Sequence, residues 1–415
     1  MEHINMNSET IFNIIIGIIV VNFLLERWLD WLNDKNSSAV LPEELKGIYD
    51  DEKYAKQRAY DKVKGRFSML SSTFSFVLIL AMLFFKGFAF VDAYAKSITD
   101  HPIVLPILFF GILMVASDIL TTPFSLYSTF VIEEKFGFNR TTIKTYILDK
   151  IKGALLGAIL GGGFLALFIW FYNSMGTFFW LWTWGAIAIF MVLATMFYAS
   201  VIVPLFNTLT PLEDGELKTE ITKYCQKVGF NLENLFVMDG SKRSSKANAF
   251  FSGLGAKKKI VLYDTLANEY SKEEITAVLA HEIGHYKKKH TLVAMIVGVL
   301  QMGAMLFILS LVINKPEFSM ALGVQEKSFH IGLLVFSMLY SPLSMLIGVL
   351  MNVISRKNEY EADNYAKTTY KPEPLVSSLK KLSVDSLSNL TPHPYDVFLN
   401  YSHPTLLQRI KALYN

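Results

Sequence analysis

The sequence predicts an α-helical membrane protein whose chain crosses the bilayer seven times. Of its 415 residues, 52% are hydrophobic and only 18% are charged, whereas a soluble globular protein carries about 25% charged residues. Long runs without Asp, Glu, Lys or Arg recur along the chain, and a helix needs about 20 apolar residues to cross the hydrocarbon. The net charge of +3 is too small to indicate a nucleic-acid partner. A single cysteine, Cys225, excludes an intrachain disulfide.

The charge-free runs position the seven spans. The longest run, 153–212, is interrupted by NSMGT at 173–177, so we expect two helices there. The expected spans are, in chain order, 9–27, 66–86, 103–124, 152–173, 178–203, 291–313 and 329–354.

Two features inside the spans invite an explanation. Gly153, Gly157 and Gly161 repeat every four residues, a spacing that lets another helix approach closely. Asp118 interrupts the third span, and a carboxylate at that depth is costly unless it faces protein or water. We expect tight helix packing at the glycines, with dimerisation as the alternative. At Asp118 we expect either a site near the bilayer or water-filled interior, or a fixed helix-terminal contact.

The basic residues predict the orientation. The four connections on one side of the expected spans hold 35 of the 39 Lys and Arg residues, and the other connections hold four. Basic residues gather on the cytoplasmic side of membrane proteins. The N-terminus is therefore expected outside, with the insert 204–290 and the C-terminal part 355–415 in the cytoplasm.

The insert 204–290 combines helices with short strands. We expect an amphipathic helix over 212–230 that ends at Gly229. Strands are expected in 234–241 and 258–266, which are rich in Val, Ile, Leu and aromatic residues. The stretch 242–255 between them reads as a loop that leads to an edge strand.

The segment 271–290 carries the motif His-Glu-x-x-His on a predicted helix. Ser271 and Glu274 have the spacing of a capping box, which marks a helix start. His281 and His285 therefore share one helix face and could hold one metal ion, with Glu282 able to reach a metal-bound water as a general base. The alternative is two surface histidines beside a salt-bridging glutamate.

A catalytic zinc needs a third protein ligand. His290, five residues after His285, would lie on the wrong face of the helix. The best candidate is Glu359, with Asp363 four residues later to orient a ligand histidine through its free ring nitrogen. Glu361 is expected to face elsewhere. The alternative for this segment is a solvated, charged helix start.

His403 precedes Pro404, which we expect to open a terminal helix. A histidine at a helix N-terminus could donate a hydrogen bond to the oxyanion of a tetrahedral intermediate, and the alternative is a capping or buried structural histidine. His3, His101, His330 and His393 have no partner at ligand spacing, so we expect them to be structural. Their positions are read directly from the sequence.

Five segments together resemble the type I CAAX prenyl proteases, which are seven-span membrane zinc endopeptidases. They are TFVIEEKFGFN (129–139), ANAFFSG (247–253), HEIGH (281–285), SRKNEYEAD (355–363) and YSHP (401–404). The resemblance covers nearly the whole chain, and the segments occur in the family's order with the family's number of spans between them.

The resemblance implies one Zn²⁺ held by His281, His285 and Glu359, with Glu282 as catalytic base. It further implies that Asp363 supports a ligand, that His403 stabilises the transition state and that Asn248 contacts the substrate backbone. The expected fold is a bundle of seven transmembrane helices around a chamber, with a cytoplasmic gluzincin-like zinc metalloprotease domain. The expected substrate is a peptide or protein with a lipidated C-terminus, from which a tripeptide is removed.

The expected organisation has four parts: helices 1–5 in 1–203, the metalloprotease insert in 204–290, helices 6–7 in 291–354, and a part completing the zinc site in 355–415. We expect a monomer in the bilayer. The chain ends twelve residues after His403 without the extension of eukaryotic members, which favours a bacterial inner-membrane protein. The competing hypotheses are a membrane quality-control protease, disfavoured by the seven spans, and a non-proteolytic scaffold.

Overall fold

Seven long apolar helices form the body of the molecule in the computed structural model, which describes residues 7–37, 46–231, 234–253 and 258–415. Four of these helices are unbroken: α1 (Ser8–Asn36), α2 (Asp51–Phe84), α6 (Ile143–Ser174) and α12 (His290–Val312). A fifth, α14 (Phe329–Thr369), runs for 41 residues. The other two are composite: α4 (Val104–Tyr127) continues through η2 (Ser128–Glu133) and α5 (Glu134–Phe136), and η3 (Gly176–Phe178) continues through α7 (Phe179–Phe197), η4 (Tyr198–Ile202) and α8 (Val203–Phe206).

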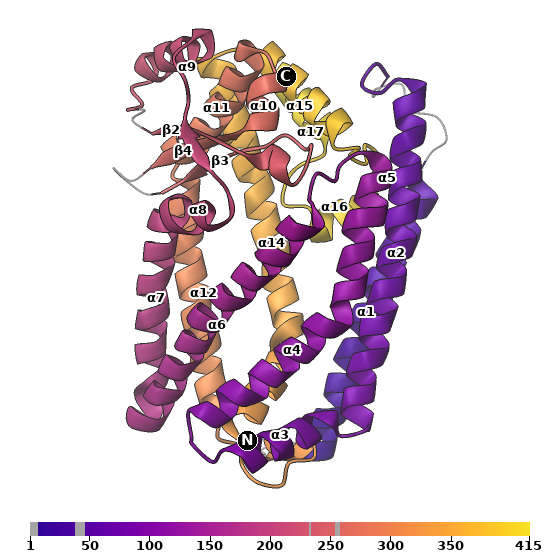
Figure 1. The fold of residues 1–415 in the computed structure, drawn as a ribbon, viewed down its shortest axis with the longest axis vertical. Coiled ribbons are helices and arrows are strands. Elements are labelled where there is room, and N and C mark those ends of the chain that lie inside the picture. The colour runs from indigo at the N-terminus through magenta and orange to yellow at the C-terminus, as the bar shows by residue number, and fades with distance from the viewer. Residues whose placement is uncertain (1–6, 38–45, 232–233, 254–257) are drawn as a thin grey trace.

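The seven predicted spans are confirmed, including the break in the longest charge-free run. The helix α6 ends at Ser174 and η3 begins at Gly176, so NSMGT separates two spans. The helices stand along the long axis of the molecule, with α4 and α6 crossing it obliquely (Figure 1).

The interpretation of the glycine repeat is wrong for this chain. A Cβ added at Gly153, Gly157 or Gly161 would meet no atom within 4 Å, so no described helix packs against that face of α6. Asp118 on α4 is instead paired with Lys150 on α6, with 2.9 Å between Oδ2 and Nζ, and 62% of its side chain is exposed. An exposed charged pair on two membrane-spanning helices fits a bundle that encloses water, because lipid would penalise it.

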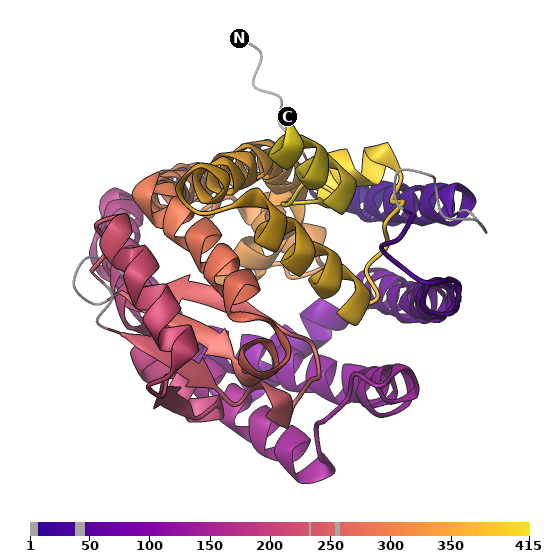
Figure 2. The ribbon, with the colours of Figure 1, turned by 90° about the horizontal axis from the view of Figure 1, so that it is seen from above.

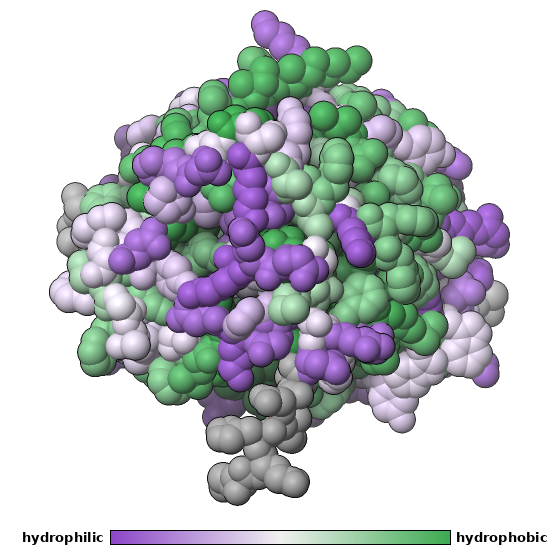
Figure 3. All heavy atoms as spheres, turned by 90° about the horizontal axis from the view of Figure 1, so that it is seen from below, coloured by the Kyte–Doolittle hydropathy of each residue, from purple (hydrophilic) through white to green (hydrophobic). Residues whose placement is uncertain are grey.

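One end of the bundle is closed by two short helices, α3 (Gly87–Ile98) and α13 (Pro316–Ala321), which the sequence reading did not predict. They belong to the largest apolar core, which joins Phe88 and Phe318 to Phe109, Leu309 and Val335 of the long helices. Seen from this end, hydrophilic side chains gather at the centre of the face within an apolar surround (Figure 3).

The other end carries a four-stranded sheet with the order β1-β2-β4-β3. Strands β2 and β4 are parallel, and β1 and β3 pair antiparallel at the two edges. The strands are β1 (Leu209–Pro211), β2 (Leu235–Met238), β3 (Ala249–Ser252) and β4 (Lys259–Tyr263). The two predicted strands and the edge strand are confirmed, and β1 is an addition.

Helices pack over this sheet and beside it (Figure 2). They are α9 (Glu216–Lys227), η5 (Gly240–Lys242), α10 (Asp264–Glu269), α11 (Lys272–Lys287), α15 (Pro372–Asp385) and α17 (Leu406–Tyr414). A further helix, α16 (Pro394–Asn400), packs against α14 and α1 instead. The predicted helix before Gly229 corresponds to α9, and Gly229 has a φ of +59° just after it, as a left-handed helix end requires. One core unites Ile221, Leu262 and Leu279 with Leu375 and Leu413, so the C-terminal segment completes the fold of the insert.

The segment 129–139 is attached to the chain that leads into β3. The backbone N–H of Ser245 donates to the carbonyl of Phe138 at 3.1 Å, and Asn139 pairs antiparallel with Ser244. The ammonium of Lys246 lies 3.2 Å from Glu133 Oε2 and 4.2 Å from the ring centroid of Phe138. Strand β3 is thereby fixed to the end of a membrane helix.

Candidate metal centre and substrate cavity

The helix α11 begins at a complete capping box, as predicted. Ser271 Oγ accepts a hydrogen bond from the backbone of Glu274 at 3.2 Å, and Glu274 Oε2 accepts one from the backbone of Ser271 at 2.9 Å. Further along, Gly284 permits a close approach of α14: a Cβ there would lie 3.1 Å from the Cα of Ala362. This contact brings Glu359, one turn earlier on α14, against the motif face of α11.

Three side chains converge where α11 meets α14. His281 Nε2 and His285 Nε2 are 3.1 Å apart, and His285 Nε2 is 3.2 Å from Glu359 Oε1. The three ligand atoms all lie within 4.8 Å of one another, the only group of this kind found among the described residues. The carboxylate of Glu359, which is remote in sequence from the motif, therefore lies next to the two imidazole nitrogens.

The donor set fits a divalent metal such as zinc. Oε2 of Glu359 is buried and has no hydrogen-bond partner among the described residues, and such an atom is costly unless a cation or donor compensates it. Two histidines and one glutamate are a known set of catalytic zinc ligands that leaves a fourth position for water.

Asp363 lies behind His281, as predicted. Its Oδ1 is 2.8 Å from Nδ1 of His281, the nitrogen that faces away from the convergence point. Arg409 of α17 holds the same carboxylate with two hydrogen bonds, Nε to Oδ2 at 2.8 Å and Nη2 to Oδ1 at 2.6 Å. The sequence did not predict this role of Arg409, because the contact joins residues 46 positions apart.

A cavity of about 130 Å³ opens beside the three ligand candidates. Its lining includes Glu282, His403, Asn248 and Arg409, together with apolar side chains of α15. Asn248 precedes the edge strand β3, and its own Oδ1 accepts from the backbone of Ala249 at 2.8 Å. The cavity thus joins the motif helix, a strand edge and the C-terminal segment.

The electrostatics of the motif helix follow from burial and from the carboxylates. Burial raises the pKa of Glu282, which makes this carboxylate a stronger proton acceptor than a free one. Burial acts to lower the pKa of His281, but hydrogen bonds to Asp363 and Glu359 outweigh it and raise this pKa to about 9. A metal bound to His281 would therefore displace a proton.

His403 lies at the mouth of this cavity with 62% of its side chain exposed. Its Nε2 is 3.4 Å from Glu359 Oε1, and its Nδ1 is 2.9 Å from Ser402 Oγ. The terminal helix begins later than predicted: Thr405, not Pro404, caps it, and α17 starts at Leu406. The ring is therefore presented by the turn that precedes the helix.

Neither His290 nor Glu361 joins the three converging ligands, as predicted for both residues. Their contacts were not predicted: Nδ1 of His290 is 3.0 Å from Nδ1 of His285, and Oε2 of Glu361 is 3.2 Å from Nε2 of His290. His290 reaches this position because α11 ends at Lys287 and the chain turns before α12 begins at His290.

The remaining histidines make structural contacts. His101 and His393 accept hydrogen bonds from backbone amides at the starts of helices. His330 pairs with Asp92 at the opposite end of the bundle. His3 lies outside the described residues.

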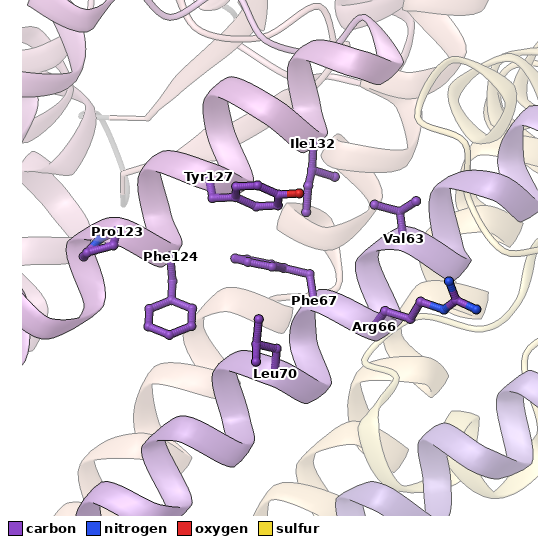
Figure 4. A pocket seen from close by; sticks show the side chains of 8 residues that line it. All are labelled: Val63, Arg66, Phe67, Leu70, Pro123, Phe124, Tyr127 and Ile132. Atoms are coloured by element: carbon purple, nitrogen blue, oxygen red, sulfur yellow. The ribbon is translucent and has the colours of Figure 1, made fainter.

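A larger cavity of about 580 Å³ lies between α2 and α4, away from the metal centre. Figure 4 shows the ring of Tyr127 lying over that of Phe67 in its lining, and the two ring centroids are 5.1 Å apart. The lining is apolar apart from Arg66 and the Tyr127 hydroxyl. It offers no group that could act on a peptide bond.

Two family models together match nearly the whole chain. Residues 30–208 match the model described as CAAX prenyl protease N-terminal, five membrane helices. Residues 211–415 match the model of peptidase family M48. The chain is 35% identical to CAAX prenyl protease 1 of Saccharomyces cerevisiae, over 100% of this chain and 96% of that protein. It belongs to the CAAX prenyl protease 1 family.

Other members agree with this assignment. The human CAAX prenyl protease 1 homolog is 32% identical over 90% of this chain and 88% of its own length. The crystal structure of S. mikatae Ste24p superposes with a TM-score of 0.93 at 35% identity, covering 98% of this chain and 99% of that one. This family member is therefore an integral, multi-pass membrane metalloendopeptidase, and M48 peptidases are zinc-dependent in general. The resemblance and the fold class predicted from the sequence are confirmed.

Proposed function

We propose that this chain is a zinc endopeptidase that cuts lipidated peptides at the cytoplasmic face of a membrane. The observation that carries the proposal is the convergence of His281, His285 and Glu359, whose ligand atoms lie within 4.8 Å of one another. All three come from one chain, which supports a monomer as the working unit. The insert 204–290 and the part 355–415 would act together as the catalytic unit.

His281 and His285 would hold zinc through Nε2, and Glu359 would hold it through its carboxylate. Zinc bound there would act as a Lewis acid that acidifies water and polarises the scissile carbonyl. Asp363 accepts from Nδ1 of His281, so it keeps the lone pair of Nε2 directed at the metal. Arg409 fixes Asp363 in that position.

Glu282 would act as the general base, taking a proton from the attacking water and delivering it to the leaving amine. Burial raises the pKa of Glu282, which strengthens this carboxylate as a proton acceptor. His403, which reaches the cavity from the solvent side, would donate a hydrogen bond to the developing oxyanion. Asn248 and the outer edge of β3 would bind the substrate backbone as an added strand.

The substrate class rests on the relatives and on the membrane. The relatives are named for CAAX prenyl processing, so we propose a prenylated C-terminal CaaX sequence as the substrate, with the lipid retained in the bilayer or bundle. Because 35 of 39 basic residues lie on one side of the spans, the metal centre would face the cytoplasm.

The test compares four reactions of the purified chain in lipid vesicles. A farnesylated CaaX peptide is incubated with wild-type protein, with wild-type protein plus a zinc chelator, and with Glu282→Gln, while the unfarnesylated peptide serves as the substrate control. We expect release of a tripeptide only from the farnesylated peptide, abolished by the chelator and reduced about 100- to 10,000-fold by Glu282→Gln.

Each alternative has its own outcome. Equal cleavage of the unfarnesylated peptide would favour a general quality-control protease. Cleavage that ignores both the chelator and Glu282→Gln would refute the proposed mechanism. No cleavage by a zinc-loaded wild-type protein would refute the proposed substrate class.

A further inference from the structure

The side chains of His290 and Glu361 form a row of contacts that ends at His285, on the side of its ring opposite the convergence point. Nδ1 of His285 lies 3.0 Å from Nδ1 of His290, and Nε2 of His290 lies 3.2 Å from Oε2 of Glu361. His290 is buried, whereas 39% of the Glu361 side chain is exposed. The row thus runs from the protein surface to a residue of the metal centre.

The hydrogen positions in this row are fixed by chemistry. A carboxylate only accepts, so Nε2 of His290 must donate to Glu361. A neutral His290 then offers the lone pair of Nδ1, which can accept a proton only from Nδ1 of His285. That assignment leaves the lone pair of His285 on Nε2, which is the atom that faces His281 and Glu359.

The backbone is shaped to deliver His290 to this position. Lys289 adopts a φ of +61°, one of three positive values among the described non-glycine residues. Such a conformation costs free energy for a lysine and persists where the surrounding contacts over-determine it. Lys289 lies between α11, which ends at Lys287, and α12, which begins at His290. Its conformation reverses the chain direction enough for the imidazole of His290 to contact that of His285.

The Nδ1 atoms of the two motif histidines therefore contact different partners. His281 rests directly on Asp363, a buried carboxylate held by Arg409. His285 reaches its carboxylate only through the ring of His290.

We propose that His290 and Glu361 are positioning residues that set the tautomer and orientation of His285 for metal binding. The row raises the basicity of Nε2 of His285 and holds its ring in the plane that meets Glu359. Neither residue touches the metal or the substrate. Loss of either is therefore expected to weaken metal binding before it affects any chemical step.

The inference rests on the proposed metal site, so the experiment measures zinc itself. Purified full-length variants are equilibrated with graded concentrations of a zinc-buffering chelator, and bound zinc per chain is determined by elemental analysis. We expect His290→Leu to weaken zinc binding ~10- to 100-fold, and Glu361→Gln to weaken it less, because the amide oxygen still accepts without charge. The double variant should match His290→Leu alone, since both changes interrupt one row.

Lys357→Gln is the matched control. Lys357 lies one helical turn before Glu361, 3.9 Å from its other oxygen, with 77% of its side chain exposed. Removing this charge should leave zinc affinity within about twofold of wild type, as expected for a surface pair.

Two further variants separate the possible failures. His281→Ala must lose zinc if the proposed metal site is right, so its retention of wild-type affinity would refute that site. If His281→Ala loses zinc while His290→Leu and Glu361→Gln both keep wild-type affinity, the positioning role alone is refuted. Should His290→Leu fail to fold, Glu361→Gln decides by itself, because the partly exposed Glu361 is not part of a core.

Discussion

The helix α14 carries a buried histidine–carboxylate cluster near each of its ends, and the two clusters have different consequences. Near its start, His330 Nε2 lies 2.6 Å from Asp92 Oδ1. Near its end, Glu359 meets His285 at 3.2 Å. The 29 residues between them span about 44 Å of helix, more than the ~30 Å hydrocarbon core of a bilayer. The two clusters therefore lie far apart, toward opposite ends of the helix bundle.

The difference lies in what completes each cluster. The second oxygen of Asp92 accepts from Lys96 at 2.9 Å, so a built-in cation neutralises the carboxylate. The second oxygen of Glu359 is buried and makes no hydrogen bond with any described residue. A structural ion pair is closed by its own side chains, whereas a metal centre leaves lone pairs pointing at a common point.

The contacts of Arg409, an arginine beside Glu359, support this distinction. Arg409 Nη1 lies 3.5 Å from Glu359 Oε2, but its hydrogen-bonding nitrogens are directed at Asp363. The arginine thus hydrogen-bonds Asp363 and makes only a longer ion pair with Glu359. Histidine and carboxylate in contact are not sufficient to identify a metal site, and the partner of the second oxygen is the useful discriminator.

The largest expected effect comes from removing the negative charge of Glu359. Glu359→Gln should reduce zinc affinity by more than about 100-fold, beyond the ~10- to 100-fold typical of residues behind the ligands, and cleavage should be lost with it. Bound zinc measured by elemental analysis checks this. Full zinc occupancy in the variant would mean that the two clusters do not differ as described.

Removing the charge of Asp92, in the other cluster, should lower the stability of the protein and leave zinc binding unchanged. Asp92→Asn removes the anion that contacts both Lys96 and His330, and breaking a buried ion pair costs about 3–5 kcal/mol. We expect a lower thermal unfolding midpoint with unchanged zinc content. Glu326→Gln is the control, since Glu326 is 86% exposed and lies 3.9 Å from Lys96. Loss of zinc in Asp92→Asn would contradict the separation of the two clusters.

The third prediction concerns the support of His281. Arg409→Met removes both hydrogen bonds to Asp363, so this carboxylate should hold His281 less firmly and zinc affinity should fall about 10-fold. Arg409→Lys should give an intermediate loss, because a lysine cannot reproduce the bidentate geometry. Chelator competition measures both. Equal affinity in all three proteins would show that Asp363 needs no partner.

Much of the fold was predictable because its signals are local. The spans follow from runs of apolar residues, and the start of α11 follows from Ser271 and Glu274 alone. The convergence of Glu359 with the motif was also foreseen, because few acidic residues follow a span at a spacing of four. The glycine repeat misled because its spacing shows only that close packing is possible, and no described residue packs against it.

The supports of the site were not predictable from spacing. The position of His290 depends on one left-handed residue, Lys289, and no sequence rule assigns a positive φ to a lysine. Arg409 reaches Asp363 because the chain end folds back over the insert and shares its core through Leu413. Both are consequences of tertiary structure and need the whole fold to be known.

The smallest expected effect provides a local reporter for the comparison. Cys225 is buried in the core beneath the metal centre, and burial raises the pKa of its thiol to about 11. Only the thiolate reacts with alkylating agents, so at pH 8 the folded protein should be labelled about 100-fold more slowly than an ordinary thiol. Mass spectrometry of intact protein after timed alkylation measures this rate.

The control for this prediction is Asp92→Asn. This variant should leave the alkylation rate of Cys225 unchanged at temperatures below unfolding, because the core around Asp92 and the core around Cys225 are separate. Faster labelling in that variant would show that the two ends of the molecule unfold as one unit.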